Sequence, residues 1–221
     1  MEQAAAATLP PSEPPTPPLQ SAAHATPTPS APRTAQVLEQ LFELYPHLFG
    51  RAFLPLQRGV FQELLANHPE HFERASLKAA LGLHTRSTRY LQSVASGKQR
   101  HDLQGVAVEA VAPEHVYLAL LELFRRRQGR SAEDLRPKLR AQLRAAFEAS
   151  GLTRQEYLSR VQTKDALANT LLEEALAERD QKLARNEAWR RAFESSGKTA
   201  AEFAAMYGLD ERAVTAALAH D

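Results

Sequence analysis

Proline placement divides this chain more sharply than any other feature of its sequence. Residues 1–32 hold nine of the fourteen prolines, with Ala, Ser and Thr between them. A segment of this composition cannot bury enough apolar surface to offset the entropy lost when its backbone is ordered. We predict that residues 1–32 form a disordered Pro/Ala-rich arm, and that this arm is a solubilising leader rather than a Pro-rich partner motif.

From Thr34 onward, apolar residues recur with the spacing of amphipathic helices. Between two of these helices the period changes to two, and the alternating residues flank Gln104-Gly105, which predicts a β-hairpin with glycine at the turn. The sequence thus predicts a mainly α domain with one β-hairpin over residues 33–130. We expect its helices at about 34–46, from Pro55, at 76–84, from Thr85 or Ser87 through Val94, and from Pro113.

After Gly129 the pattern is entirely helical and contains a repeat. FEASGLTRQEYL at 147–158 and FESSGKTAAEFA at 193–204 align without gaps at an offset of 46 residues. In each copy a helix should end near the glycine, and the threonine two residues later should cap the next helix together with a glutamate three residues on. We predict an all-α C-terminal extension over 131–221 built from two related helical hairpins. Its 14 Lys/Arg and 15 Asp/Glu indicate a solvated helix surface with no net attraction for phosphate.

Positive charge is concentrated in residues 74–105, although the whole chain carries a formal net charge of only +1. Asp102 is the one acid in this segment. A local cationic face with an aromatic residue, Tyr90, among its guanidinium groups is typical of a surface that meets a polyphosphate. We interpret the partner as nucleic acid, and RNA in particular. The cations of the segment are Arg74, Lys78, Arg86, Arg89, Lys98 and Arg100.

Several function classes receive no support from the sequence. The chain has no cysteine, which excludes disulfides and thiolate nucleophiles and fits a reducing compartment. Its first residues lack the basic start of a signal peptide, and no apolar run of about 18 residues follows, so we expect a cytoplasmic protein that is neither exported nor membrane-spanning. No phosphate-loop, dinucleotide, zinc-protease or serine-hydrolase motif occurs. We therefore expect no enzyme, no catalytic residues and no cofactor.

His68 and His71 lack a third ligand, so we expect a loop there rather than a metal site.

Five strings of the chain resemble the ProQ/FinO domain, a family of bacterial RNA chaperones, in their order and spacing. The resemblance covers roughly residues 34–128. It implies a small, mostly helical α/β fold with one β-hairpin. It also implies binding of structured small RNAs and mRNA 3′ ends, especially stem-loops with single-stranded 3′ tails, and a role in post-transcriptional regulation by small RNAs. The strings are LYPHLFG (44–50), PLQRGVFQELL (55–65), LKAALGLHTRSTRYLQSV (77–94), GKQRHDLQG (97–105) and PEHV (113–116).

The resemblance also assigns roles to single residues. It places Thr85 at the start of the fourth helix, where the terminal nucleotide of the RNA would be held, and a helix N-terminus suits phosphate. Gly82, His84 and Gln57 depart from the family pattern at places where Arg, Tyr and Lys are common, and Arg58, Arg86 and Lys98 restore part of the missing charge. The predicted RNA-binding residues are Lys78, Thr85, Arg86, Arg89, Tyr90, Lys98 and Arg100.

Each of these assignments has an alternative. Exposed arginines on helices are often simply solvated, and a lone tyrosine such as Tyr90 is often an aromatic at the edge of a core. Arg100 can form a local or cross-strand ion pair on its hairpin, which contributes little at a surface, and Asp102 can tighten the turn. For the whole chain, the alternatives are a DNA-binding transcriptional regulator and a protein-interaction module that works through the C-terminal helices.

Overall fold

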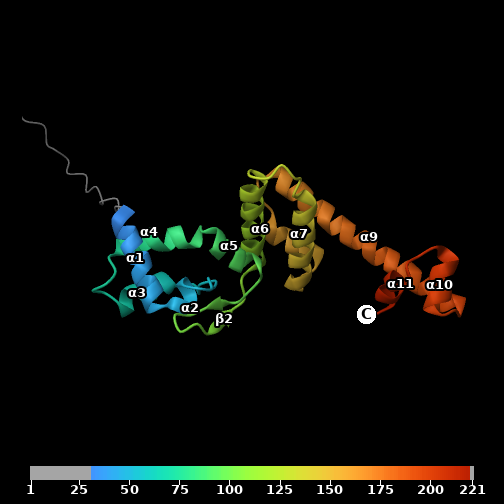
Figure 1. The fold of residues 1–221 in the computed structure, drawn as a ribbon, viewed down its shortest axis with the longest axis horizontal. Coiled ribbons are helices and arrows are strands. Elements are labelled where there is room, and N and C mark those ends of the chain that lie inside the picture. The colour runs from blue at the N-terminus through green and yellow to red at the C-terminus, as the bar shows by residue number, and fades with distance from the viewer. Residues whose placement is uncertain (1–30, 220–221) are drawn as a thin grey trace, which may run out of the picture.

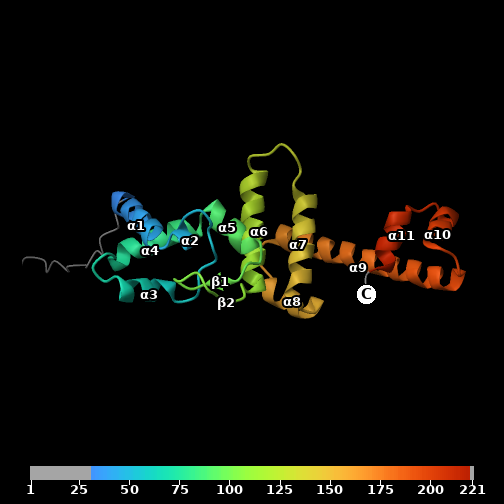
Figure 2. The same cartoon turned by 60° about the horizontal axis from the view of Figure 1, so that its bottom comes forward.

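The computed structural model describes residues 31–219 and extends along one long axis. Residues 31–109, from the first helix α1 (Ala31–Leu44) to the β-hairpin, form one end, and the helices within residues 113–161 stand in the middle. The long helix α9 (Ala166–Ser196) projects toward the last two helices at the other end (Figures 1 and 2). The predicted disordered arm lies outside the described residues except for its last two, which begin α1.

The N-terminal part is mainly helical with one β-hairpin, and this prediction is confirmed. The largest difference lies after Pro55, where a helix was predicted to begin at once. Instead, the backbone first runs alongside the hairpin: His101 N donates to Pro55 O at 2.7 Å and Gln57 N donates to His101 O at 2.9 Å. The helix starts only after Gly59, which has a positive φ of 87°. The elements are α1 (Ala31–Leu44), α2 (Pro46–Phe49), α3 (Val60–Asn67), α4 (Arg74–Thr85), α5 (Thr88–Ala95), β1 (Arg100–His101), β2 (Ala107–Glu109) and α6 (Pro113–Gln128).

The hairpin turn requires its glycine. Gly105 has a φ of 79°, and a Cβ there would lie 2.6 Å from Cδ2 of His47, whose Nε2 lies 3.1 Å from the carbonyl oxygen of Leu103. Asp102 Oδ1 accepts a hydrogen bond from Val106 N at 2.8 Å, so Asp102 tightens the turn as expected. Leu103 is buried and fixes the turn to the core.

The C-terminal extension is helical and repeated, as predicted. Thr153 and Thr199 each form a capping box with the glutamate three residues on. The glycines that end the preceding helices, Gly151 and Gly197, have φ of 63° and 61°. The remaining elements are α7 (Arg136–Ser150), α8 (Arg154–Val161), α9 (Ala166–Ser196), α10 (Ala200–Tyr207) and α11 (Glu211–Leu218).

One hydrophobic core runs through most of the molecule. It joins residues of α1 to α6, such as Leu41 and Tyr117, to residues of α7 and α8, such as Leu143 and Tyr157. It ends at Leu176 in α9, and a second small cluster around Phe203 and Val214 joins the end of α9 to α10 and α11. The core is continuous across residue 130, so the predicted boundary there marks a change of sequence pattern rather than a gap in packing. The division into domains at that residue stays a prediction.

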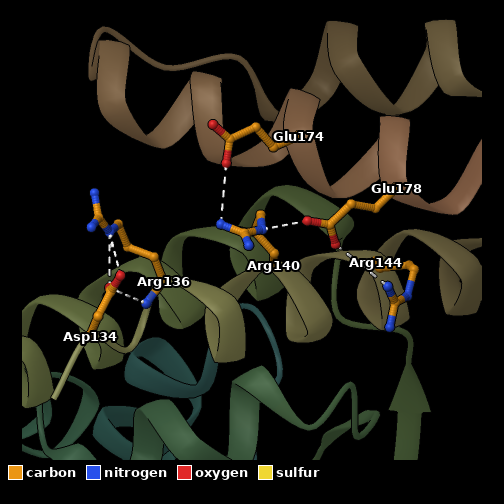
Figure 3. A network of polar contacts seen from close by, with 6 residues as sticks. All are labelled: Asp134, Arg136, Arg140, Arg144, Glu174 and Glu178. Carbon is orange, nitrogen blue, oxygen red and sulfur yellow. Dashed lines mark hydrogen bonds and ion pairs between the residues drawn. The ribbon is translucent and has the colours of Figure 1, made fainter.

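Ion pairs tie the helices of the extension together. Arg140 on α7 lies between Glu174 and Glu178 of α9, at 3.3 and 2.7 Å, and Arg144 reaches Glu178 at 3.8 Å (Figure 3). Asp134 and Arg136 pair at 2.9 Å at the start of α7. Exposed pairs contribute little stability, but they neutralise much of the positive charge of this half of the chain.

Two absences hold for the described residues. None of the helices within 31–219 is both long and apolar enough to cross a membrane. Nor do any three His, Asp or Glu side chains in that range meet in a way that could hold a metal ion. His68 instead ends α3, with its Nε2 at 2.7 Å from the hydroxyl of Tyr45.

Candidate nucleic-acid interface

Tyr90 and Arg100 converge on the backbone of Leu56. The hydroxyl of Tyr90 accepts a hydrogen bond from Leu56 N at 3.1 Å, and Arg100 Nη1 donates to Leu56 O at 2.9 Å. Tyr90 is only 7% exposed. Burial raises the pKa of Tyr90, although the Leu56 hydrogen bond and nearby Arg100 partly offset it. The ring of Tyr90 is therefore a core aromatic, as the alternative interpretation held.

The side chain of Arg100 is 13% exposed and has polar neighbours on three sides. Besides the Leu56 carbonyl, it forms an ion pair with Glu109 at 3.6 Å, and its Nη2 lies 3.3 Å from His115 Nδ1. Arg100 and Glu109 are register partners in the hairpin. The cross-strand ion pair that the sequence left open for Arg100 is thus present in the structure, and its partner is Glu109 of the neighbouring strand.

A cavity of about 390 Å³ opens beside these two residues, between α5 and α6. Tyr90 and Arg100 line it together with His115 and Arg125, and Arg125 pairs with Asp165 at 2.7 Å. Glu122 adds one carboxylate, which lies 3.8 Å from Arg125 and pairs with Arg126 at 2.8 Å. Apolar side chains of α5 and α6 form the rest of the wall. Its volume lies in the range of small-molecule sites, so a nucleotide-sized group could enter. Sequence reasoning did not assign His115 to this site, because a lone histidine at a helix start has no distinguishing pattern.

The predicted RNA-binding cations of α4, α5 and the loop after α5 are exposed, and none of them pairs with a carboxylate of the described residues. Lys78, Arg86 and Lys98 have no acidic group within 4.0 Å in the part of the chain that the structure describes. Arg89 donates to the carbonyl of Arg51 at 2.7 Å and lies 4.5 Å from the ring centre of Phe53, again without a carboxylate. Because these charges are not neutralised within the described protein, they remain available to an anionic partner.

Comparisons with known proteins point to one family. The sequence model of the ProQ/FINO family matches residues 32–136. Two curated proteins named RNA chaperone ProQ are similar to this chain. The one from Alteromonas mediterranea is 37% identical over 113 residues, which is 48% of this chain and 50% of that protein. The one from Idiomarina loihiensis is 40% identical over 89 residues, 38% of this chain and 42% of that protein.

Residues 32–136 match the ProQ/FinO family model.

A solved structure of a FinO-like RNA chaperone from Neisseria meningitidis is also similar, with 32% identity over 40% of this chain and 71% of that chain, at a TM-score of 0.37. The chain spans about half the length or less of the two curated relatives. The family match confirms the resemblance found in the sequence. It ends at residue 136, so the rest of α7 and all of α8–α11 lie outside the ProQ/FinO domain.

The position predicted for Thr85 in this ProQ/FinO domain is wrong. Thr85 is the last residue of α4, and its hydroxyl donates to Leu81 O at 2.8 Å. The N-cap of α5 is Ser87, whose hydroxyl accepts from Tyr90 N at 3.2 Å. The sequence allowed either Thr85 or Ser87 to cap this helix. In the structure Thr85 still belongs to α4, so the cap of α5 is Ser87.

The two departures from the ProQ/FinO pattern in α4 have structural explanations. A Cβ at Gly82 would lie 3.4 Å from the guanidinium nitrogens of Arg86, so Arg86 occupies the space over Gly82 and brings a positive charge there. His84 is 4% exposed and packs against the rings of Phe49 and Phe53. Burial lowers the pKa of His84 to about 4, so it is a neutral core residue at neutral pH.

Apart from Thr85, the predicted residues thus fall into two groups. Tyr90 and Arg100 meet beside one cavity, and Lys78, Arg86, Arg89 and Lys98 stand exposed along α4, α5 and the loop that follows. Arg126 of α6 also reaches this region, because its Nη1 donates to Arg86 O at 2.9 Å. Cations near the end of a helix also favour its C-terminal dipole, and only the fold brings Arg126 to the junction of α4 and α5.

Proposed function

We propose that residues 32–136 bind structured RNA and that the protein acts as an RNA chaperone. The observation that carries this proposal is the set of exposed cations of α4, α5 and the loop after α5 that have no carboxylate partner among residues 31–219, together with the cavity beside Tyr90 and Arg100. The names of the curated relatives support the same function.

Lys78, Arg86, Arg89 and Lys98 are proposed to contact phosphates along an A-form stem. Side chains cannot read the deep major groove of an RNA helix, so such a stem is recognised by its shape and backbone. The cavity beside Tyr90 and Arg100 is proposed to receive the 3′ end, with Arg100 and Arg125 as its cations. The preferred RNAs are then stem-loops with single-stranded 3′ tails, such as terminators, and the protein acts in post-transcriptional regulation by small RNAs. This mode of binding needs no catalysis, metal or cofactor.

The test compares three probes on the full chain: an RNA hairpin with a 3′ tail, the same hairpin with its tail trimmed, and a DNA hairpin of matching sequence. We expect the tailed RNA to bind most tightly. Equal affinity for the RNA and DNA hairpins would favour a DNA-binding regulator, and no affinity for any probe would favour a protein-interaction module.

A charge-matched pair of variants locates the surface. Lys78→Ala with Arg86→Ala should weaken binding about tenfold or more, because a hydrogen bond to a charged group contributes about 1.5 kcal/mol or more. Lys138→Ala with Lys164→Ala removes the same charge from exposed positions of the extension and should leave the affinity nearly unchanged. Similar losses in both variants would mean that binding depends on total charge and not on α4.

Chaperone activity is tested separately, by the rate at which two complementary structured RNAs pair. The full chain should raise this rate, and the Lys78→Ala, Arg86→Ala variant should raise it less. Tight binding without any change in the pairing rate would limit the function to RNA binding.

A further inference from the structure

A groove of about 380 Å³ lies between the far half of α9 and α11, at the opposite end of the molecule from the ProQ/FinO domain (Figure 1). Lys182, Arg185 and Trp189 line one wall, and their spacing of three to four residues places them on one face of α9. The other wall is made of small side chains. All the lining residues are Lys182, Arg185, Asn186, Trp189, Ala213, Ala216 and Ala217.

The repeat shows that this groove replaces what is packed core in the first copy. At the offset of 46 residues, Arg185 corresponds to Leu139 and Trp189 to Leu143, which are 1% and 0% exposed. In the first copy these leucines belong to the continuous core. In the second copy Arg185 is exposed and Trp189 is half-buried. A cation and an indole at these positions do not fill a core, although the helix ends and capping boxes around them are the same.

Helix α11, which faces α9 across the groove, also has a smaller side chain than its counterpart in the first copy. Ala217 corresponds to Leu171 of the first copy, which is 3% exposed and part of the core. A smaller side chain opposite the indole leaves one side of Trp189 accessible from the groove. The second copy is therefore built with an open, aromatic-lined groove where the first copy is closed.

The charge of the groove is positive. No acidic residue lines it, and Lys182 and Arg185 have no carboxylate within 4.0 Å among the residues from Ala31 to Ala219. The nearest acids along α9 are engaged elsewhere: Asp180 pairs with Arg154 at 2.6 Å, and Glu187 pairs with Arg191. Cations beside an accessible aromatic ring are the combination that binds single-stranded nucleic acid, in which bases stack on the ring and phosphates meet the charges.

We propose that this groove is a second RNA site, which binds single-stranded RNA through stacking on Trp189 and phosphate contacts to Lys182 and Arg185. The proposal rests on the proposed function for the choice of RNA as the nucleic acid. Helix α9 rises about 1.5 Å per residue, so its 31 residues span about 46 Å and Lys182 lies about 24 Å from its start. The groove can thus hold a segment well away from the stem that α4 and α5 would bind.

The only tryptophan of the chain is Trp189, so its fluorescence reports on this groove directly. The probe is an unstructured uridine-rich RNA of about a dozen nucleotides, a length within the 4 to 16 nucleotides that single-strand-binding folds cover. Titration of the full chain with this RNA should quench or shift the Trp189 emission, and added salt should reverse the change. An unchanged emission at RNA concentrations that saturate binding would contradict the proposal.

Three variants of the full chain then separate the groove from general charge. Trp189→Leu restores the residue type of the first copy, so it should keep the fold, and it should weaken binding of the single strand roughly fivefold or more because stacking is lost. Lys182→Ala with Arg185→Ala should weaken it as well. Lys198→Ala with Arg212→Ala removes the same charge from exposed positions outside the groove and should have little effect. Equal losses in the two double variants would overturn the proposal.

Binding of the labelled hairpin with its 3′ tail is measured on the same proteins by anisotropy. If the hairpin binds and the single strand neither binds nor changes the emission, the second site is wrong while the proposed function stands. If the single strand changes the emission and the hairpin does not bind, the proposed function of the domain fails and the groove remains. If Trp189→Leu binds neither the hairpin nor the single strand and its circular dichroism spectrum is that of an unfolded protein, Trp189 is a structural residue and the proposal is overturned.

Discussion

At the scale of single residues, Tyr90 illustrates how a binding candidate can also be part of the core. The sequence offered it both as a stacking surface and as a core aromatic, and only the contact with Leu56 N decides what its hydroxyl does. Its family position could be predicted, but its burial and its place beside the cavity could not, because both depend on β1 and α6, which are distant in sequence.

Tyr90→Phe should therefore reduce stability rather than RNA affinity. The change leaves the buried N–H of Leu56 without its acceptor, and an unsatisfied buried donor costs about 1–3 kcal/mol. Urea unfolding of the two proteins measures the difference. A variant as stable as the original, with much weaker RNA binding, would mean that the hydroxyl contacts RNA and not the backbone.

His84 gives the protein a pH dependence of known sign. Its pKa in the folded state is about 4 against about 6.5 in an unfolded chain, so protonation favours unfolding. The stability that neutral His84 contributes is fully present above about pH 6.5 and is lost as the pH falls toward 4, by about 3 kcal/mol in total. His84→Phe should flatten this part of the curve of unfolding free energy against pH. Parallel curves for the two proteins would show that other groups cause the dependence.

At the scale of elements, local signals predicted the helices and the hairpin well where a cap or turn residue defines them. Gly105 and the repeated Thr–Glu capping boxes behave as predicted, because each depends on residues within a few positions. The predicted start of α3 at Pro55 was wrong, because the helix begins at Val60. Pro55 suits a first helical turn, but its carbonyl is used by His101 of the hairpin, a partner 46 residues away that no local pattern reveals.

Ser87, and not Thr85, is the N-cap of α5. Ser87→Ala should destabilise the fold by about 0.5–2 kcal/mol, the usual effect of losing an N-cap. Thr85→Ala removes only a bond to a carbonyl of its own helix and should have a smaller effect. Thermal unfolding of both variants gives the order, and a larger loss for Thr85→Ala would place the functional cap at Thr85 after all.

At the scale of the whole molecule, the core that crosses residue 130 joins the ProQ/FinO domain to the extension. The sequence divides the chain there, because charge and composition change, but packing between distant segments is not visible in composition. The continuous core includes Leu139, Leu143 and Phe147 from beyond the family match. The extension therefore supports α6, which lines the candidate cavity.

A fragment of residues 33–130 should consequently be less stable than the full chain. It would expose apolar side chains of α6 that α7 and α8 cover, and burial of one such side chain contributes about 1.5–3 kcal/mol. Thermal unfolding of the fragment and of the full chain measures the loss. Equal melting temperatures would show that the boundary at 130 separates two independent domains.

The central claim is that exposed cations of α4 and α5 bind RNA phosphates, and the salt dependence of hairpin binding tests it most directly. With contacts from Lys78, Arg86, Arg89 and Lys98, the logarithm of the affinity should fall with the logarithm of the salt concentration at a slope of about −2.8 to −3.6 or steeper, since each contact adds about −0.7 to −0.9. The variant with all four changed to Ala should bind weakly, with a slope reduced to the contribution of the cations that remain, such as Arg100 and Arg125. A slope near zero for the original protein, or an unchanged slope for the variant, would contradict the claim.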